Sequence, residues 1–200
     1  EALRLWIDKV REQFVASPEG KQFLRYHKGA TKRLEEELYP VSILSTHLFG
    51  NQADVLVRLC RPGAHYDADL TASEGQRIAR IEITSAIDWR AEQIRMEHLT
   101  KYGRAPAYNQ LQFSGTMHTR SILQQWPSAI CAADYTDEIC ERISRAAQEK
   151  LSKHYQPDVW ILISYEGLHG PNSGKYTRAI QQHASTEIAK VLGKRVVFIV

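Results

Sequence analysis

The chain has 200 residues, of which 43% are hydrophobic and 24% are charged, and its formal net charge is +3. These values fit a globular protein with a sizeable core and exclude a disordered, collagen-like or strongly polybasic chain. The small excess of positive charge permits a polyanionic partner but does not require one.

Cysteine usage and hydropathy indicate the compartment. Cys60, Cys131 and Cys140 are an odd number with no CxxC pair, which argues against a disulfide framework or a zinc knuckle. No signal peptide is recognisable, and no apolar run approaches the roughly 20 residues of a membrane helix. We therefore expect a cytoplasmic protein without a membrane partner. The chain starts without Met and stops inside "RVVFIV", as a piece of a longer protein would.

Helical periodicity covers residues 1 to 38. Apolar side chains recur at helical spacing, and Ser17 followed by Pro18 predicts a break and a new helix start. After Gly29, the stretch "ATKRLEEELYP" predicts a further helix that is ended by Pro40.

Three strand-like segments follow, at residues 53 to 59, 65 to 70 and 77 to 84. They combine β-forming residues with polar and apolar alternation. Turn-forming residues at 61 to 63 and at 72 to 75 separate them, which predicts two consecutive antiparallel hairpins.

The rest of the chain alternates between helix and strand patterns. The expected elements are a helix from an Asp88 N-cap to Tyr102 closed by Gly103, a mixed segment at 104 to 130, a helix at 136 to 155, a strand at 158 to 164, a helix at 175 to 193 and a strand at 195 to 200. This order predicts an α/β (α+β) fold, with a central mixed sheet of antiparallel hairpin strands flanked by helices. We expect residues 1 to 29 to form a helical N-terminal extension and residues 30 to 200 to form the main domain.

Three carboxylates interrupt the apolar hairpin strands. Asp67 and Asp69 share one face of their strand, and Glu82 shares a face of the next strand with Thr84. Folding the hairpin about residues 73 to 75 places Asp67 roughly opposite Glu82. Carboxylates that face each other in a sheet repel, and a hard divalent cation would remove that repulsion.

The plain alternative is an ordinary antiparallel sheet whose polar face is solvated. In that arrangement the acids would pair with arginines of the neighbouring strand, Arg77 or Arg80.

With these acids and this order of elements, the chain resembles the restriction-endonuclease-like PD-(D/E)XK nuclease superfamily. The resemblance covers roughly residues 30 to 105, and the later strand by order only. It implies that Asp67 in "YDADL" and Glu82 in "IEITSA" bind a catalytic Mg²⁺ or Mn²⁺, with Asp69 as the alternative to Asp67.

The resemblance also implies a carboxylate from the first core helix. The candidates are Glu35, Glu36 and Glu37, of which Glu36 and Glu37 are favoured as metal ligands.

The motif departs from the superfamily pattern at Thr84, where a lysine is usual. In the superfamily this lysine orients or activates the attacking water, which a neutral hydroxyl does poorly, although some members replace it and still cleave. Thr84 is kept as the third candidate catalytic position. Four nearby side chains could take the place of the lysine: His65, Arg90, Gln93 and Arg95.

The function that the resemblance implies is metal-dependent hydrolysis of phosphodiester bonds in nucleic acid, with DNA favoured, in defence or repair. Arg90 and Arg95 are candidate phosphate contacts, although pairing with Glu92 or Glu97 would explain them equally well. Lys175, near the start of a later helix in "HGPNSGKYT", is a third candidate; the spacing there does not fit a nucleotide-binding P-loop.

Two other functions remain open at this stage. Because of Thr84, the same fold could be a catalytically degenerate module that binds nucleic acid or a protein partner. The carboxylates could also belong to an enzyme that acts on nucleotides or small phosphoesters. A homodimer would allow symmetric cleavage of both strands, and a larger complex is the other expected assembly.

Overall fold

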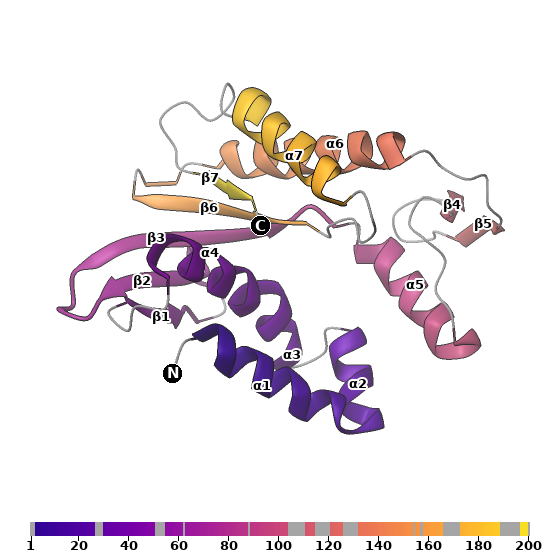
Figure 1. Ribbon diagram of the computed structural model, residues 1–200, viewed down its shortest axis with the longest axis horizontal. Helices are drawn as coiled ribbons and strands as arrows, with labels where there is room; N and C mark the ends of the chain where they lie inside the picture. The colour runs from indigo at the N-terminus through magenta and orange to yellow at the C-terminus, as the bar shows by residue number, and fades with distance from the viewer. Residues whose placement is uncertain are drawn as a thin grey trace.

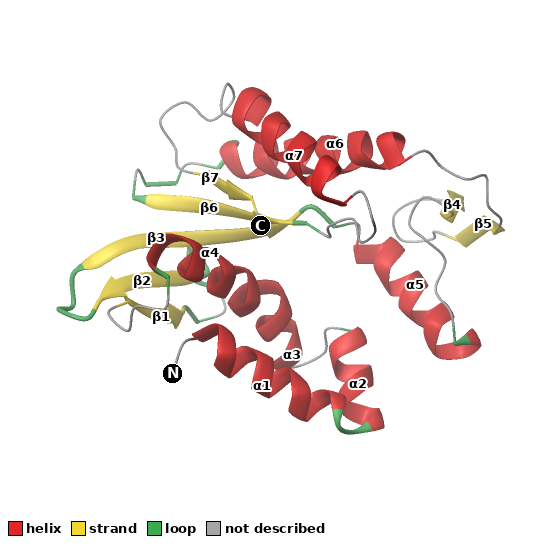
Figure 2. Cartoon of the chain, in the orientation of Figure 1, coloured by secondary structure: helices red, strands yellow, loops and turns green. Residues whose placement is uncertain are grey.

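The computed structural model describes residues 3–26, 30–50, 55–61, 63–87, 89–103, 111–114, 121–125, 132–153, 155–156, 158–165, 173–188 and 197–199. In these parts of the chain a mixed β-sheet is covered by helices on both faces, which is an α+β arrangement (Figure 1). Helices α6 and α7 lie on one face, and the N-terminal helices lie on the other (Figure 2). The predicted fold class, a mixed sheet with antiparallel hairpin strands flanked by helices, is confirmed at this level.

The main sheet has five strands in the order β1-β2-β3-β6-β7. They are β1 (Val55–Leu59), β2 (Ala68–Ala72), β3 (Arg77–Ser85), β6 (Val159–Ser164) and β7 (Val197–Ile199). Strands β1, β2 and β3 pair antiparallel, whereas β6 pairs parallel with both β3 and β7. Both predicted hairpins are therefore confirmed. The turn between β2 and β3 has Gly75 at φ 83°, a left-handed conformation that favours glycine.

Helices α6 (Ala132–Leu151) and α7 (Ser173–His183), with the π-helical continuation η3 (Ala184–Ile188), cover one face of the sheet. The buried cluster on this side consists of Ala86, Ile139, Ile143, Ala146, Ala147, Ile161, Ile163, Ile180 and Ile188. The isoleucines of α6 pack against those of β6. Each isoleucine that is fully buried contributes roughly 1.5–3 kcal/mol to folding.

Helix α4 (Tyr39–Phe49) packs on the opposite face. Its cluster consists of Val41, Leu44, Ala68, Leu70, Ile81, Ile83 and Leu162. Ile81 and Ile83 therefore point toward α4, and Glu82 between them points toward α6, as the alternation in β3 predicts.

The prediction that Pro40 ends the first core helix is wrong. The chain runs from α3 (Ala30–Arg33) through the π-helical segment η1 (Leu34–Leu38) directly into α4. The Tyr39 N–H donates to the Leu34 carbonyl, five residues back, and Pro40 then lies in the first turn of α4. Pro40 lies inside this continuous helical run, and the π-helical turn directly before it, where the bonding pattern changes, accommodates its missing N–H.

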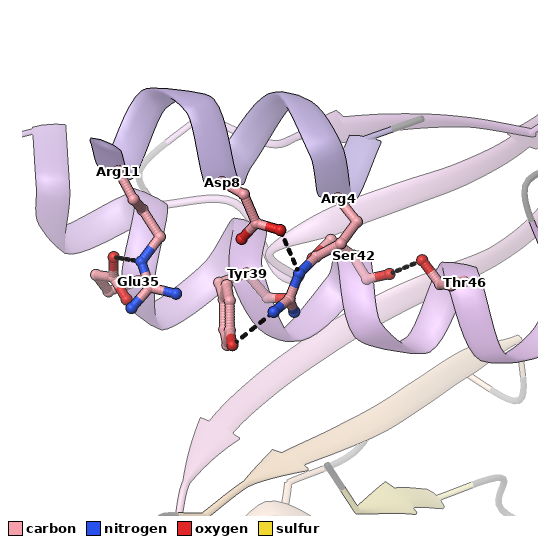
Figure 3. Close-up of polar contacts among 7 residues, drawn as sticks. All are labelled: Arg4, Asp8, Arg11, Glu35, Tyr39, Ser42 and Thr46. Atoms are coloured by element: carbon pink, nitrogen blue, oxygen red, sulfur yellow. Dashed lines mark hydrogen bonds and ion pairs between the residues drawn. The ribbon is translucent and has the colours of Figure 1, made fainter. Parts of the chain in front are cut away.

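The N-terminal helices α1 (Leu3–Val15) and α2 (Pro18–Arg25) are separated at the predicted break, where the Ser17 hydroxyl caps α2 by accepting from the Gly20 N–H at 2.9 Å. Helix α1 packs against α4 through a shared aromatic ring (Figure 3). Arg4 and Arg11 lie 4.2 and 4.6 Å from the centroid of the Tyr39 ring. The predicted domain boundary at residue 29 lies outside the described residues and stays a prediction.

Helix α5 (Trp89–Tyr102) follows β3 and ends at Gly103, as predicted. Its predicted N-cap, Asp88, lies outside the described residues. Within the segment predicted as mixed, β4 (Leu111–Ser114) and β5 (Ser121–Gln125) form a separate antiparallel pair. None of the helices that can be described is long and apolar enough to cross a membrane.

Candidate carboxylate site

Asp67 and Glu82 lie opposite each other on neighbouring strands. The register pairs Ala68 with Ile81, so the next pair toward the start of β2 is Asp67 and Glu82. The Asp67 N–H donates to the Ile81 carbonyl at 2.8 Å, and the Ile83 N–H donates to Asp67 Oδ2 at 2.7 Å. The predicted opposition of the two acids is confirmed, whereas their catalytic role stays a prediction.

Both carboxylates line a cavity of about 650 Å³. It lies between the turn that enters β2 and the segment that joins α6 to β6. Besides the two acids, its wall includes His65, Arg80, Lys153 and Tyr155. The cavity therefore combines two acidic groups with three basic ones, a mixture suited to holding a cation and an anionic ligand together.

Two side chains from outside the β2–β3 hairpin donate hydrogen bonds to Glu82. Its Oε1 accepts a hydrogen bond from Lys150 Nζ at 2.5 Å and another from the Tyr155 hydroxyl at 2.8 Å. The side chains of Lys150 and Glu82 are only 16% and 10% exposed. Two donors thus fix the position of a carboxylate that is largely removed from water.

The pKa of Asp67 is raised above its ordinary value, chiefly because the carboxyl group is buried. The negative charges of Glu82 and Glu37 raise it further, while the hydrogen bond from the Ile83 N–H and the charge of Lys150 oppose the shift. The charges of three acids therefore act on one another around Asp67. Such a perturbed carboxyl group in a cavity is typical of a functional site.

The acids of η1 have arginine or lysine partners of their own. Glu37 pairs with Arg33 at 2.8 Å, and Glu36 lies 4.0 Å from Lys32. Among the described residues, no three His, Cys, Asp or Glu side chains are grouped closely enough to hold a metal ion. Glu37 reaches Asp67 by its charge alone, so the structure does not bring Glu36 or Glu37 into one ligand set with the pair.

Glu35, the third candidate on this segment, forms an ion pair with Arg11 of α1 at 3.0 Å (Figure 3). Its carboxylate is directed to the interface between α1 and η1, which explains it as a structural group.

Asp69, the alternative to Asp67, has a different environment. It is buried and forms ion pairs with Arg58 of β1 at 2.8 Å and Arg77 of β3 at 3.5 Å. The pairing with Arg77 is the one expected of an ordinary sheet. Asp69 is therefore explained by the sheet, and Asp67 is the better candidate for a ligand.

Thr84, at the position of the usual lysine, is half-buried on β3. Of the side chains that could take the place of the lysine, His65 lines the cavity. Gln93 donates to Glu97, and Arg95 pairs with Glu92 at 2.6 Å, as the plain alternative for that helix expects. Helix α5 also lies beyond the carboxyl end of β3, at the end of the sheet opposite the turn from α6 into β6 (Figure 1). The side chains of Arg90 and Lys175 lie outside the described residues.

Lys150 and Tyr155 are the residues that the sequence reasoning missed. A signal for Lys150 was present, because it follows Ile143 by seven residues and Ala147 by three. This spacing places a lysine on the apolar face of α6, where a charged group needs a partner.

The donor chemistry of the site fits Mg²⁺ or Mn²⁺. Asp67 and Glu82 offer carboxylate oxygens, and Mg²⁺ is commonly bound by one or two carboxylates while it keeps several waters. The cavity has room for such waters, and a divalent cation would offset the negative charges of Glu82 and Glu37, which add to the effect of burial on the pKa of Asp67. These two residues would hold the metal.

Comparison with known proteins finds no relative. No protein-family model matches the sequence, and no curated protein and no solved structure matches it significantly.

Proposed function

We propose that this chain hydrolyses phosphodiester bonds of nucleic acid, DNA in preference, with a divalent metal ion held by Asp67 and Glu82. The observation that carries the proposal is the opposition of these two carboxylates across the β2–β3 hairpin, in a cavity with basic side chains. A purely structural sheet has no need to place two acids in facing positions beside a cavity, because like charges there destabilise it.

The arrangement of the elements supports the same proposal. Three antiparallel strands carry the Asp at the start of the second and the Glu within the third, and β6 then pairs parallel with that third strand. This is the order that a resemblance to the PD-(D/E)XK superfamily implies. We therefore extend that resemblance, as a proposal, to the core formed by β1, β2, β3 and β6.

The residues of the chain have distinct tasks in this reaction. A metal ion held here would polarise the scissile phosphate and lower the pKa of a bound water. Tyr155 keeps the Glu82 carboxylate in position through its bond to Oε1. Lys153 is exposed at the cavity and supplies positive charge to the phosphate backbone, which provides affinity without reading sequence. His65 is also exposed there, and its ring can form a hydrogen bond with the same backbone.

Arg80 is a further positive group on the cavity wall, held by neighbours. It lies 3.4 Å from Asp158 and 5.0 Å from the centroid of the Tyr66 ring. Its guanidinium group is thereby oriented before any substrate binds, which lowers the entropy cost of binding a phosphate.

A catalytically degenerate module that binds nucleic acid or a protein partner is the second candidate. The observation that favours it is Thr84 at the position of the usual lysine, since its hydroxyl supplies no positive charge. This alternative predicts binding without metal-dependent cleavage.

The test is a cleavage assay on plasmid and single-stranded DNA with Mg²⁺, Mn²⁺ or EDTA. Glu82→Gln is compared with wild type, and Glu74→Gln in the exposed β2–β3 turn serves as the matched control. We expect cleavage that needs metal, survives in the control and falls more than about 100-fold in Glu82→Gln, since loss of outer partners of metal ligands alone costs about 10- to 100-fold. DNA binding without cleavage would favour the module, and cleavage in EDTA would contradict the proposal.

A further inference from the structure

Lys150 places a cation on a carboxylate that a metal would use. It lies in the last turn of α6, and its ammonium group is 2.5 Å from Glu82 Oε1. The same ammonium group also acts electrostatically on Asp67, where it opposes the rise of the pKa. The single positive charge of Lys150 thus pairs with Glu82 and also acts electrostatically on Asp67.

Packing alone does not account for this lysine. Neighbouring positions on the same face of α6 are filled by Ile143 and Ala147, which are 0% and 1% exposed. Replacing a buried ion pair by well-packed apolar groups is often neutral or stabilising, so the pair is weak evidence of a role in stability. The role of Lys150 is better sought in what its charge does to the carboxylates.

We propose that Lys150 is a built-in competitor of the divalent cation: its ammonium group neutralises Glu82 in the metal-free protein, and its charge opposes the binding of a metal ion to that carboxylate. The inference rests on the proposed function, since it takes Asp67 and Glu82 as the metal ligands. Lys150 is a positioning residue, because it acts on the metal through Glu82.

The competition follows from elementary electrostatics. A dication and an ammonium group held at one carboxylate in a partly buried site repel each other strongly. The metal would therefore bind more weakly than the two carboxylates alone would allow, by the free energy of that repulsion or of moving the Lys150 side chain away. Tyr155 donates to the same oxygen as a neutral group, so it can keep Glu82 oriented while the ammonium group moves away.

The competition also sets the metal concentration at which the site is occupied. At low concentrations of divalent cation Lys150 satisfies Glu82 and the two acids remain compatible with the fold. The site changes from the Lys150-paired form to the metal-bound form only when the metal concentration is high enough. Lys150 therefore sets the concentration at which metal binds.

The experiment measures Mn²⁺ affinity by isothermal titration calorimetry on the full chain, in wild type and Lys150→Met. We expect Lys150→Met to bind Mn²⁺ at least about tenfold more tightly, because the positive charge that opposes the cation is removed. For a proton, one such charge within about 4–6 Å shifts the affinity of a carboxyl group by one to three powers of ten. Lys150→Arg keeps the charge and should stay near the wild-type affinity. Lys21→Met removes an exposed lysine of α2 that does not line the cavity; it is the matched control and should change little.

Lys150→Gln is a second neutral variant, used in case Lys150→Met does not fold. Its amide can still donate a hydrogen bond to Glu82 but carries no charge. The second readout is the rise in melting temperature on adding Mn²⁺, which grows with affinity and should be larger in both neutral variants than in wild type.

The outcomes separate the two proposals. Unchanged affinity in both neutral variants, with wild-type Mn²⁺ binding that still depends on Glu82, would overturn the competition and leave the proposed function standing. Weaker binding in the neutral variants would show that Lys150 supports the metal and would overturn it as well. Absence of Mn²⁺ binding in every variant would overturn the metal site itself.

Discussion

Asp67 and Asp69 are two residues apart in the chain and have opposite electrostatic surroundings. Asp69 lies between two arginines, one from each neighbouring strand, which together balance its charge. Asp67 instead faces Glu82, and burial and neighbouring acids raise its pKa. The sheet thus neutralises one acid and leaves the other in conflict with its neighbours.

The difference separates an acid that the fold explains, Asp69, from one that we propose is functional, Asp67. A carboxylate that is paired on both sides can be explained by the fold alone. A carboxylate kept beside other acids lowers stability, and such local costs are characteristic of sites retained for activity. Measurements on the two aspartates test this division directly.

The largest effect on stability is expected for Asp69→Asn. The amide keeps the shape but loses both charge-assisted contacts, so the free energy of unfolding should fall by about 1–2 kcal/mol. Denaturant unfolding in a chelating buffer measures it. Asp158→Asn is the matched control: Asp158 also pairs with an arginine, but its side chain is 47% exposed, and we expect less than about 1 kcal/mol. Equal losses in the two variants would remove the structural distinction of Asp69.

The opposite sign is expected for Asp67→Asn. The amide oxygen can still accept from the Ile83 N–H while the unfavourable charge disappears, so stability at neutral pH should rise by roughly 0.5–1 kcal/mol. Because the pKa of Asp67 is raised in the folded state, ionisation costs stability as the pH rises through that pKa. The gain should therefore vanish below the ordinary pKa of aspartate, where the carboxyl group is neutral in both states. A gain that persists in acid would have another cause.

The opposition of Asp67 and Glu82 could be predicted from the sequence, because local patterns determine it. Alternation along 77–84 decides which face Glu82 occupies, and the turn at 72–75 decides which residue of β2 it meets. Both depend on contacts close in sequence. The opposition of Asp67 and Glu82 follows from them without knowledge of the tertiary fold.

The partners that complete the site depend on tertiary packing instead. Lys150 and Tyr155 are separated from Glu82 by 68 and 73 residues, so only the docking of α6 on the sheet brings them together. Helix α4 was missed for a related reason. Proline usually breaks a helix, and the π-helical turn that precedes and accommodates Pro40 has no clear sequence signal.

The smallest effect concerns the thiol beside Asp69. Burial raises the pKa of Cys60, and the negative charge of Asp69, whose Oδ2 lies 3.9 Å from Sγ, raises it further. Because the thiolate is the reactive form, we expect Cys60 to be alkylated slowly in wild type and a few-fold faster in Asp69→Asn.

Peptide mapping after timed exposure to iodoacetamide measures the rate at each cysteine. Cys140 provides the internal control, since its pKa is raised by burial and by Asp137 on its own helix, and its rate should not change. Identical rates for Cys60 in the two proteins would mean that Asp69 exerts no net negative charge there. In that case the two arginines would already cancel its field completely, and the contrast with Asp67 would be sharper than the pKa of Cys60 indicates.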